Sequence, residues 1–312
     1  MENDRMLAFL KTEGVSESLL DGVRDYRKQF PTLGQYASRV PAADYLYYGK
    51  DVWEAALSAL LCGKNLLLAG PKATGKNVFA ENLAAAFGRP SWNVSFHVGA
   101  DAAYLLGTDT FNGDRVVFRP GPITLCAENG GFAVLDEINM AKNEALAVLH
   151  STLDHRRAID LSGYDRIAIH PAARFIGTMN YGYAGTRELN EALCSRFAVL
   201  EMPVISEADL LRLIGSRYPH MKEDIRGQFA RLFFELDKKA SSAEISDRAL
   251  DLRGLLDAIG MMEMGTLSGA ALDMCITNKT FDVYERKLIR DVIAARIPAD
   301  MSRDMIFTDR HA

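Results

Sequence analysis

The segment that most constrains this chain is a glycine-rich turn between an apolar run and a helical pattern. Residues 65–69 form a short apolar run typical of a buried parallel strand, and a helical pattern over 76–87 follows. The turn reads Gly70-Pro71-Lys72-Ala73-Thr74-Gly75-Lys76, which has the spacing of a phosphate-binding loop. In such a loop backbone N–H groups surround the phosphates and the lysine reaches the outer two. The sequence therefore predicts a nucleotide site, with ATP and Mg²⁺ as its ligands.

The position after the lysine departs from this pattern. Asn77 stands where Ser or Thr is expected to offer its hydroxyl to Mg²⁺. An amide oxygen also ligates Mg²⁺, so we expect Asn77 to be a metal ligand with an altered affinity.

A second apolar run ends in two acids. The run over 132–135 leads into Asp136 and Glu137. Asp136 is predicted to hold Mg²⁺ through water, and Glu137 to polarise the water that attacks the γ-phosphate. Both acids would lie beside the phosphate loop if the two strands are neighbours in the sheet.

Two polar residues adjoin later strand patterns. Asn180 ends a run over 175–179, where its amide could reach the γ-phosphate or the attacking water. Arg196 ends a helical pattern over 188–195. One interpretation of Arg196 is a charge that complements the helix dipole. The other is an arginine finger that stabilises transition-state charge at a neighbouring subunit's nucleotide.

Strand and helix patterns alternate up to Pro203, and only helical patterns follow. Alternation predicts an α/β fold with a parallel sheet covered by helices on both faces. We expect an N-terminal helical segment over 1–42, a nucleotide-binding domain over 43–204 and a smaller all-α domain with a C-terminal tail over 205–312. The further strands are predicted at 92–97, 132–136, 174–179 and 197–202, an alternating pair at 157–169, and helices at 51–61, 121–128, 142–153, 207–216, 223–236, 247–262, 268–275 and 282–296.

Composition excludes some classes of function. The chain has 312 residues, a net charge of −5 and no long basic block, so a nucleic acid partner is not indicated. The scattered cysteines, with no Cys-x-x-Cys pair, predict reduced core thiols and a cytoplasmic protein. Since no apolar run has membrane-spanning length, no membrane insertion is expected.

The motifs together resemble those of AAA+ ATPases, and in detail those of the MoxR group with its CbbQ, NorQ and gas-vesicle GvpN relatives. The resemblance covers about residues 44–260. It is carried by segments in the order of that family: Gly70-x4-Gly75-Lys76, Asp136-Glu137-Ile138-Asn139, Gly177-Thr178-Met179-Asn180, and Gly185-Thr186 through Leu189-Asn190 to Ser195-Arg196-Phe197.

The resemblance implies a role for several residues. Asn180 would be sensor 1, Arg196 the arginine finger and Arg248 the sensor 2 residue of a helical lid, with Arg253 on the same predicted helix as the alternative. His97 falls where such proteins keep a polar residue that restrains the catalytic glutamate, although a surface residue fits it as well. The remaining candidates are Tyr47 and Tyr48 at the adenine seat, or as core aromatics, and Phe111 in a helix-2 insert facing the pore of a ring.

The resemblance also implies an activity. Proteins of this group are ring-forming, commonly hexameric ATPases that remodel a client protein, often with a partner that carries a von Willebrand factor A domain. Two alternatives stay open: a motor subunit similar to McrB that acts on nucleic acid, and a nucleotide-binding scaffold that hydrolyses little, which only Asn77 suggests.

Overall fold

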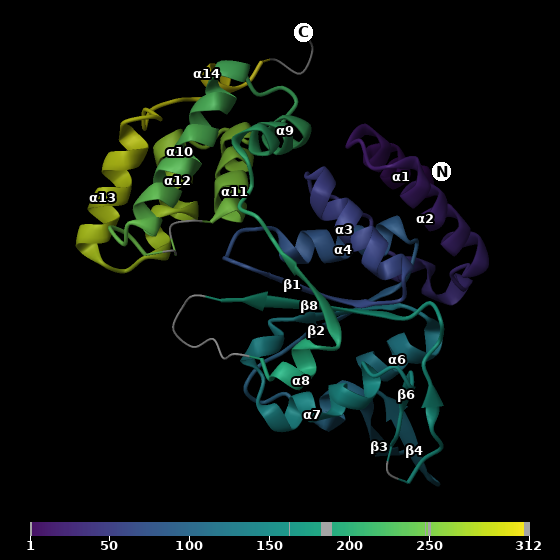
Figure 1. Cartoon of the computed structure of the whole chain (residues 1–312). Coiled ribbons are helices and arrows are strands. Elements are labelled where there is room, and N and C mark those ends of the chain that lie inside the picture. The colour runs from purple at the N-terminus through teal and green to yellow at the C-terminus, as the bar shows by residue number, and fades with distance from the viewer. Residues whose placement is uncertain (1, 162, 182–188, 247, 249–250, 309–312) are drawn as a thin grey trace. The chain divides into compact units, whose positions relative to one another are not determined.

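The structure is a computed structural model that describes residues 2–161, 163–181, 189–246, 248 and 251–308. The chain divides into two compact units (Figure 1). Residues 1–71 and 75–203 form the first unit, and residues 72–74 and 204–312 form the second.

The first unit contains a five-stranded parallel sheet. Its strands lie in the order β2-β5-β8-β1-β9. They span Asn65–Gly70 (β1), Ser91–Ser95 (β2), Phe132–Asp136 (β5), Arg174–Asn180 (β8) and Phe197–Glu201 (β9). All four pairings are parallel, which confirms the predicted α/β sheet.

The sequence predicts the two acids beside the phosphate loop on the condition that their strands are neighbours. The structure does not meet this condition, because β1 and β5 are not paired. Strand β8 lies between them: Ile176 pairs with Leu66 of β1 on one side and with Val134 of β5 on the other. The reason is that β8, which comes later in the chain, enters the sheet between β5 and β1. The order of strands along the sequence does not reveal this position. As a result, Asn180 lies between the loop and the acids.

Helices cover both faces of the sheet (Figure 1). On one face lie α3 (Lys50–Leu61) and α4 (Lys76–Ala86), and on the other α6 (Pro122–Asn129), α7 (Asn143–Thr152) and α8 (Glu191–Cys194). Because strand side chains alternate, β1, β5 and β8 contribute to both cores. The first core takes Leu66, Leu68, Phe132, Val134 and Ile176, and the second takes Leu67, Ala133, Leu135 and Phe175.

The N-terminal segment adds a further layer to the first core. It forms α1 (Glu2–Thr12), α2 (Glu17–Gln29) and the 3₁₀ helix η1 (Gly34–Arg39). Its buried side chains belong to the same cluster as Trp53 of α3 and include Met6, Leu10, Leu20, Val23 and Tyr26. The segment therefore packs on the sheet unit.

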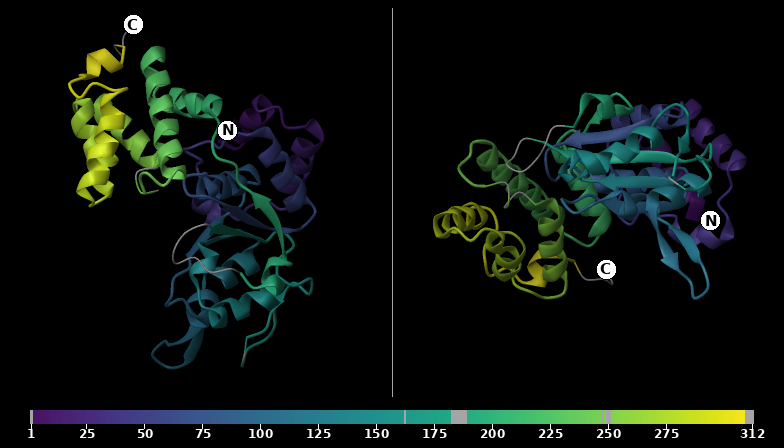
Figure 2. Two further views of the ribbon diagram at one scale, coloured as in Figure 1. Left: turned by 60° about the vertical axis from the view of Figure 1, so that its left-hand side comes forward. Right: turned by 90° about the horizontal axis from the view of Figure 1, so that it is seen from below.

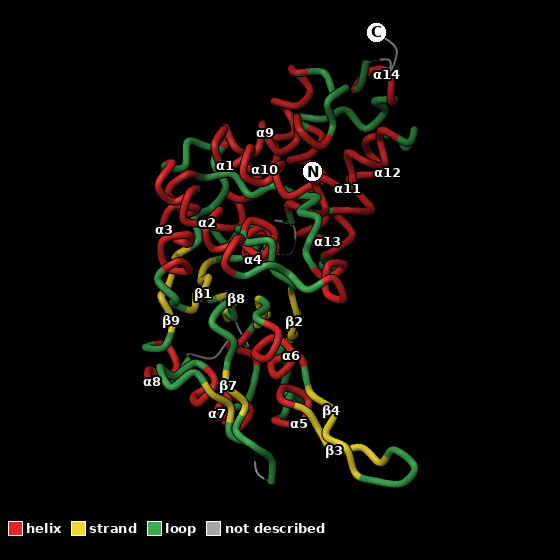
Figure 3. The backbone as a smooth tube through the Cα atoms, turned by 90° about the vertical axis from the view of Figure 1, so that its right-hand side faces the viewer, coloured by secondary structure: helices red, strands yellow, loops and turns green. Residues whose placement is uncertain are grey.

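Two hairpins are inserted in the sheet unit. After α5 (Ala102–Leu106), β3 (Gly107–Phe111) and β4 (Val116–Pro120) form an antiparallel pair that projects from the unit (Figures 2 and 3). Phe111 near its tip is 73% exposed. The predicted pair over 157–169 is present, but its strands are only Ala158–Ile159 (β6) and Ile167–Ala168 (β7).

The second unit is helical, as predicted. It contains α9 (Glu207–Arg217), α10 (Glu223–Ser241), α11 (Leu252–Glu263), α12 (Ser268–Cys275), η3 (Thr277–Lys279), α13 (Val283–Ala294) and α14 (Arg303–Ile306). Ser206 caps the first of these helices, since its Oγ accepts a hydrogen bond from Asp209 N at 3.1 Å.

Two helices begin later than the sequence indicates. The helix predicted over 247–262 begins at Leu252, because Asp251 caps it by accepting a hydrogen bond from Arg253 N. Residues 247, 249 and 250 lie outside the described part of the chain, and Arg248 is in a turn. Likewise the helix predicted over 188–195 begins at Glu191, where Asn190 caps it.

The cysteines depart in part from the predicted core thiols. All four are free, but only Cys126 is buried, and Cys62 at the end of α3 is exposed. Burial raises the pKa of the Cys126 thiol. In the described residues we find no helix with the length and apolarity needed to cross a membrane.

Candidate functional site

The phosphate loop has backbone that favours anion binding. Gly75 (φ 77°) and Ala73 (φ 61°) both adopt the left-handed conformation. That conformation costs a residue with a Cβ about 1 kcal/mol or more, so its presence at Ala73 marks a loop shaped for function. Left-handed residues in such a loop are typical of backbone that presents successive N–H groups to an anion. The helix α4 then begins at Lys76, which adds its dipole.

Gly75 has a second reason to be glycine. A Cβ placed there would lie 3.3 Å from the ring of Tyr47, closer than ordinary packing allows. The same ring packs against Phe79 of α4 with centroids 4.6 Å apart. Tyr47 is therefore a packed aromatic, as one of the two interpretations expects, and it lies against the phosphate loop.

Lys76 is buried and held by the loop itself. Its Nζ donates hydrogen bonds to the carbonyl oxygens of Gly70 (3.0 Å) and Pro71 (2.6 Å). Burial lowers the pKa of Lys76 to about 8, while the charges of Asp136 and Glu137 act in the opposite direction. The lysine is thus electrostatically coupled to both acids, as expected of one phosphate site.

The two acids are organised by a strand that lies beside them. The hydroxyl of Thr178 in β8 donates to Asp136 Oδ1 at 2.6 Å and accepts from Glu137 N at 3.0 Å. Thr178 is 1% exposed, so these bonds form away from solvent. Glu137 itself has φ 52°. The chain turns sharply at this point. The hydrogen bond from Glu137 N to Thr178 fixes the backbone, and the backbone orients the exposed Glu137 carboxylate.

Asn180 reaches the acid that the sequence assigns to water activation. Its Nδ2 donates to Glu137 Oε1 at 3.3 Å, and its carbonyl accepts from Asn139 Nδ2 at 2.8 Å. In register, Asn180 pairs with Gly70, the first residue of the phosphate loop. The structure thus brings together Gly70, Lys76, Asp136, Glu137 and Asn180 at the carboxyl edge of the sheet.

Two residues of this site were not assigned a role from the sequence. Thr178 belongs to the motif that ends at Asn180, and the signal that the sequence offers for it is a polar residue inside an otherwise apolar strand. Asn82 was missed: it is 1% exposed on α4, its Oδ1 accepts from Tyr47 N at 2.9 Å, and its Nδ2 donates to Tyr45 O at 2.8 Å. It fixes the segment that precedes α3 onto the helix of the phosphate loop. A polar residue on the buried face of a helix is its signal.

The residues predicted to hold Mg²⁺ fit that ion chemically. Asp136 is half-buried with one oxygen fixed by Thr178, which leaves its other oxygen for a metal or its water. Asn77 is exposed in the first turn of α4, directly after Lys76. Across the described residues there is no group of three or more His, Cys, Asp or Glu that could hold a metal. One carboxylate with nucleotide phosphates suits Mg²⁺, which keeps several waters and needs few protein ligands.

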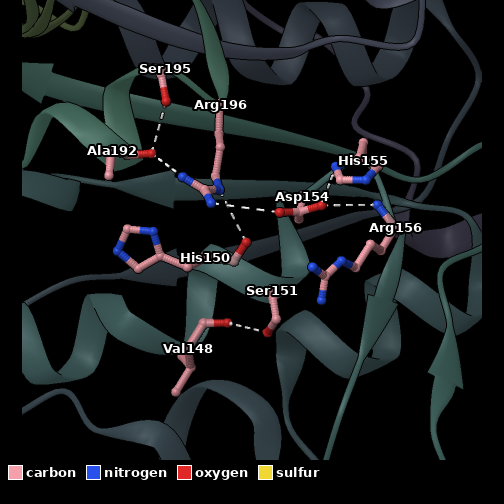
Figure 4. Close-up of polar contacts among 9 residues, drawn as sticks. All are labelled: Val148, His150, Ser151, Asp154, His155, Arg156, Ala192, Ser195 and Arg196. Carbon is pink, nitrogen blue, oxygen red and sulfur yellow. Dashed lines mark hydrogen bonds and ion pairs between the residues drawn. The ribbon is translucent and has the colours of Figure 1, made fainter.

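Arg196 lies at the end of α8 and contacts the end of α7 (Figure 4). Its Nε donates to His150 O at 3.2 Å, and its Nη2 lies 3.6 Å from Asp154 Oδ2. Its Nη1 donates to Ala192 O. Arg196 is therefore placed by its own chain at a site separate from the contacts of Lys76 and Glu137.

Other sequence candidates find less support. Arg248 is exposed and, contrary to expectation, not on the helix of Arg253, which begins at Leu252. Exposed His97 accepts from Gly99 N at 3.1 Å and packs its ring near Tyr104, which fits the surface interpretation. Gly185 and Thr186 of the family pattern lie outside the described residues.

Comparison with known proteins gives one family. Residues 65–197 match the model of an AAA domain of the dynein-related subfamily. YojN of Bacillus subtilis is 30% identical over 286 residues, covering 90% of this chain and 92% of the relative. SH1500 of Staphylococcus haemolyticus is 31% identical over 257 residues, covering 80% and 97%. SERP0979 of Staphylococcus epidermidis is 32% identical over 252 residues, covering 78% and 95%. These names state no activity.

Proposed function

Because this chain belongs to the AAA+ family, we propose that it hydrolyses ATP in a Mg²⁺-dependent reaction and uses the energy to remodel a partner protein. The observation that carries the proposal is the hydrogen bond from Asn180 to Glu137, at the sheet edge where Lys76 is buried in the loop. An amide, a carboxylate and a lysine at one edge of the sheet are the groups that hydrolysis requires.

Each residue has a distinct task in the proposed reaction. The loop over 70–76 holds the β- and γ-phosphates through backbone N–H groups, with Lys76 adding charge. The Glu137 carboxylate orients a water molecule and accepts a proton from it, while the water oxygen attacks the γ-phosphorus. The bond to the β,γ-bridging oxygen breaks, so ADP and phosphate leave. Asn180 holds the Glu137 carboxylate in place and, as sensor 1, contacts the γ-phosphate when ATP is bound.

The metal would be held by Asp136 and Asn77. Mg²⁺ in such a site neutralises charge on the β- and γ-phosphate oxygens. Thr178 orients Asp136 for this role through the hydrogen bond at 2.6 Å. Arg248 or Arg253 would serve as sensor 2 in the helical unit.

We further propose that the chain works as a ring, as a hexamer in the manner of the MoxR group. Arg196 of each subunit would complete the site of its neighbour, since its contacts place it on α7 and α8 of its own chain, apart from its own Lys76. The client would be a protein, with a von Willebrand factor A domain protein as partner. The exposed Phe111 of the β3–β4 hairpin would contact the client.

The test is phosphate release by the purified chain with ATP or GTP, each with Mg²⁺ or with a chelator. Release from ATP that needs Mg²⁺ and disappears in Lys76→Ala is the expected result. A nucleotide that binds but is not turned over would identify a scaffold. Preference for GTP, with stimulation by DNA, would instead favour a motor that acts on nucleic acid.

A further inference from the structure

Each nitrogen of the Arg196 guanidinium has a partner within its own chain (Figure 4). Its Nε and Nη1 donate to the carbonyl oxygens of His150 and Ala192, and its Nη2 faces the carboxylate of Asp154 at 3.6 Å. All three nitrogens therefore have a partner on α7, on α8 or in the turn after α7. A guanidinium binds phosphate best through two parallel N–H groups, and in this conformation Nη1 and Nη2 each already have a partner with which a phosphate would compete.

Asp154 is the only one of these partners that carries a charge. It follows α7, and its Oδ1 accepts a hydrogen bond from Arg156 N at 3.1 Å and faces His155 Nδ1 at 2.5 Å. The hydrogen bond from Arg156, and the positive charges of His155, Arg156 and Arg196, lower the pKa of Asp154 against a smaller opposing effect of burial. The carboxylate is thus fixed by its own turn, with Oδ2 directed to Arg196.

We propose that Asp154 is a positioning residue that holds Arg196 in a resting conformation and competes for it with the charge that develops on a neighbouring subunit's nucleotide in the transition state. This inference rests on the proposed role of Arg196 as a finger acting across a subunit interface. Arg196 exchanges one anionic partner for another, so its charge stays compensated in both conformations. The side chains are 26% and 20% exposed, which leaves the pair accessible for that exchange.

Such a device shifts a population and does not act on the reacting atoms. A partner that binds only the resting conformation lowers the fraction of subunits whose finger is engaged. Removal of that partner's charge raises the engaged fraction, and with it the rate at a saturated site. Nucleotide affinity changes little, because Lys76 and the loop, and not Arg196, bind the ground state of the subunit's own nucleotide.

The decisive variant is Asp154→Asn in the full chain. Asparagine keeps the shape and an oxygen that accepts from Arg156 N, while the charge that attracts Arg196 is lost. We expect kcat to rise about 1.5- to 5-fold, the range for a partly exposed ion pair, with KM and nucleotide Kd unchanged. Asp154→Glu, which restores the charge, should return kcat toward the wild-type value.

A matched control is Asp160→Asn, which removes another acid–arginine pair, to Arg166 at 3.5 Å, in the neighbouring hairpin. It should leave kcat unchanged. In the Arg196→Ala background, Asp154→Asn should have no effect, because the residue it restrains is absent. A change in that background would show a structural effect and overturn the proposal.

The two proposals fail in different ways. If Arg196→Ala turns over ATP at the wild-type rate, Arg196 is not an arginine finger and the proposed function is wrong on this point. A large loss in Arg196→Ala together with an unchanged or lower kcat in Asp154→Asn would leave the finger intact and overturn only the restraint. If Asp154→Asn lowers the melting temperature, the Asp154→Glu variant and the double variant still decide between these outcomes.

Discussion

The hydroxyl of Thr178 donates a hydrogen bond to Oδ1 of Asp136 at 2.6 Å, across two adjacent strands of the sheet. The hydroxyl oxygen of Thr178 also accepts a hydrogen bond from Glu137 N, so one buried side chain positions both acids. This relationship links the strand that enters the middle of the sheet to the chemistry proposed at its edge.

We predict that Thr178→Val lowers turnover about tenfold or more and also destabilises the fold. Valine has the shape of threonine but leaves the half-buried Asp136 and the Glu137 N–H without their partner, which costs about 1–3 kcal/mol. Thr178→Ser is the matched control, since it keeps the hydroxyl. Steady-state hydrolysis and thermal melting measure both effects. Equal turnover in the valine and serine variants would mean that the hydroxyl does not organise the acids.

The lowered pKa of Lys76 predicts a pH dependence of nucleotide binding. In the free protein this pKa is about 8, and bound phosphates raise it because they stabilise the charged form. Affinity is therefore highest where the lysine is already charged, below about pH 8, and falls as the pH rises through that value. Binding at higher pH must take up a proton.

Calorimetric titrations in buffers of different ionisation enthalpy measure this uptake. Proton uptake on ATP binding should be larger at about pH 9 than at about pH 7. The same proton uptake at both pH values, with the same affinity, would show that Lys76 is charged throughout and that burial does not control its pKa.

The Asn77 departure predicts a shift in the metal requirement. Asn77 offers an amide oxygen where the pattern has a hydroxyl, so hydrolysis should need Mg²⁺ but saturate at a higher concentration than in Asn77→Thr. Turnover titrated against free Mg²⁺ at saturating ATP gives the midpoints. An unchanged midpoint in Asn77→Thr would mean that residue 77 does not ligate the metal.

A mixing experiment tests whether Arg196 acts across a subunit interface. Arg196→Ala and Lys76→Ala subunits should each be inactive alone, because an arginine finger is worth about 10³ to 10⁵ in rate and the lysine is needed for binding. In a mixed ring, intact sites form wherever an unaltered loop meets an unaltered arginine. Activity should therefore recover on mixing, measured with co-assembly checked by size. No recovery despite co-assembly would limit Arg196 to its own subunit.

The sequence predicted most strands and helices of the sheet unit, because the apolar runs and turns that indicate them lie within a few residues of each other. The apolar run before Gly70 and the one before Asp136 are buried strands, as their composition requires. The order of those strands is a different matter. Ile176 pairs with both Leu66 and Val134 and lies more than 40 residues after the nearer of them. The residues around Leu66 and Val134 do not indicate this pairing. Long-range pairing is set by the packing of the whole sheet.

The site shows the same division. The spacing of the phosphate loop made Lys76 a candidate, and the end of an apolar run made Asp136 and Glu137 candidates. Asn82 escaped notice because its role is to hold Tyr45 and Tyr47, a contact that only the folded chain reveals. The start of α11 was placed too early because a short polar segment before a helix carries several possible caps, and Asp251 is the one used.

The most direct test of the central claim is the fate of ATP in Glu137→Gln. Glutamine keeps an oxygen that can accept from Asn180 but cannot take a proton from water, so ATP and Mg²⁺ should bind with the affinity of the wild type. Turnover should fall by about 10² to 10⁴, the contribution of a general base. Single-turnover hydrolysis of bound, radiolabelled ATP measures this step alone. Hydrolysis by Glu137→Gln at the wild-type rate would contradict the assignment of Glu137 and the mechanism that depends on it.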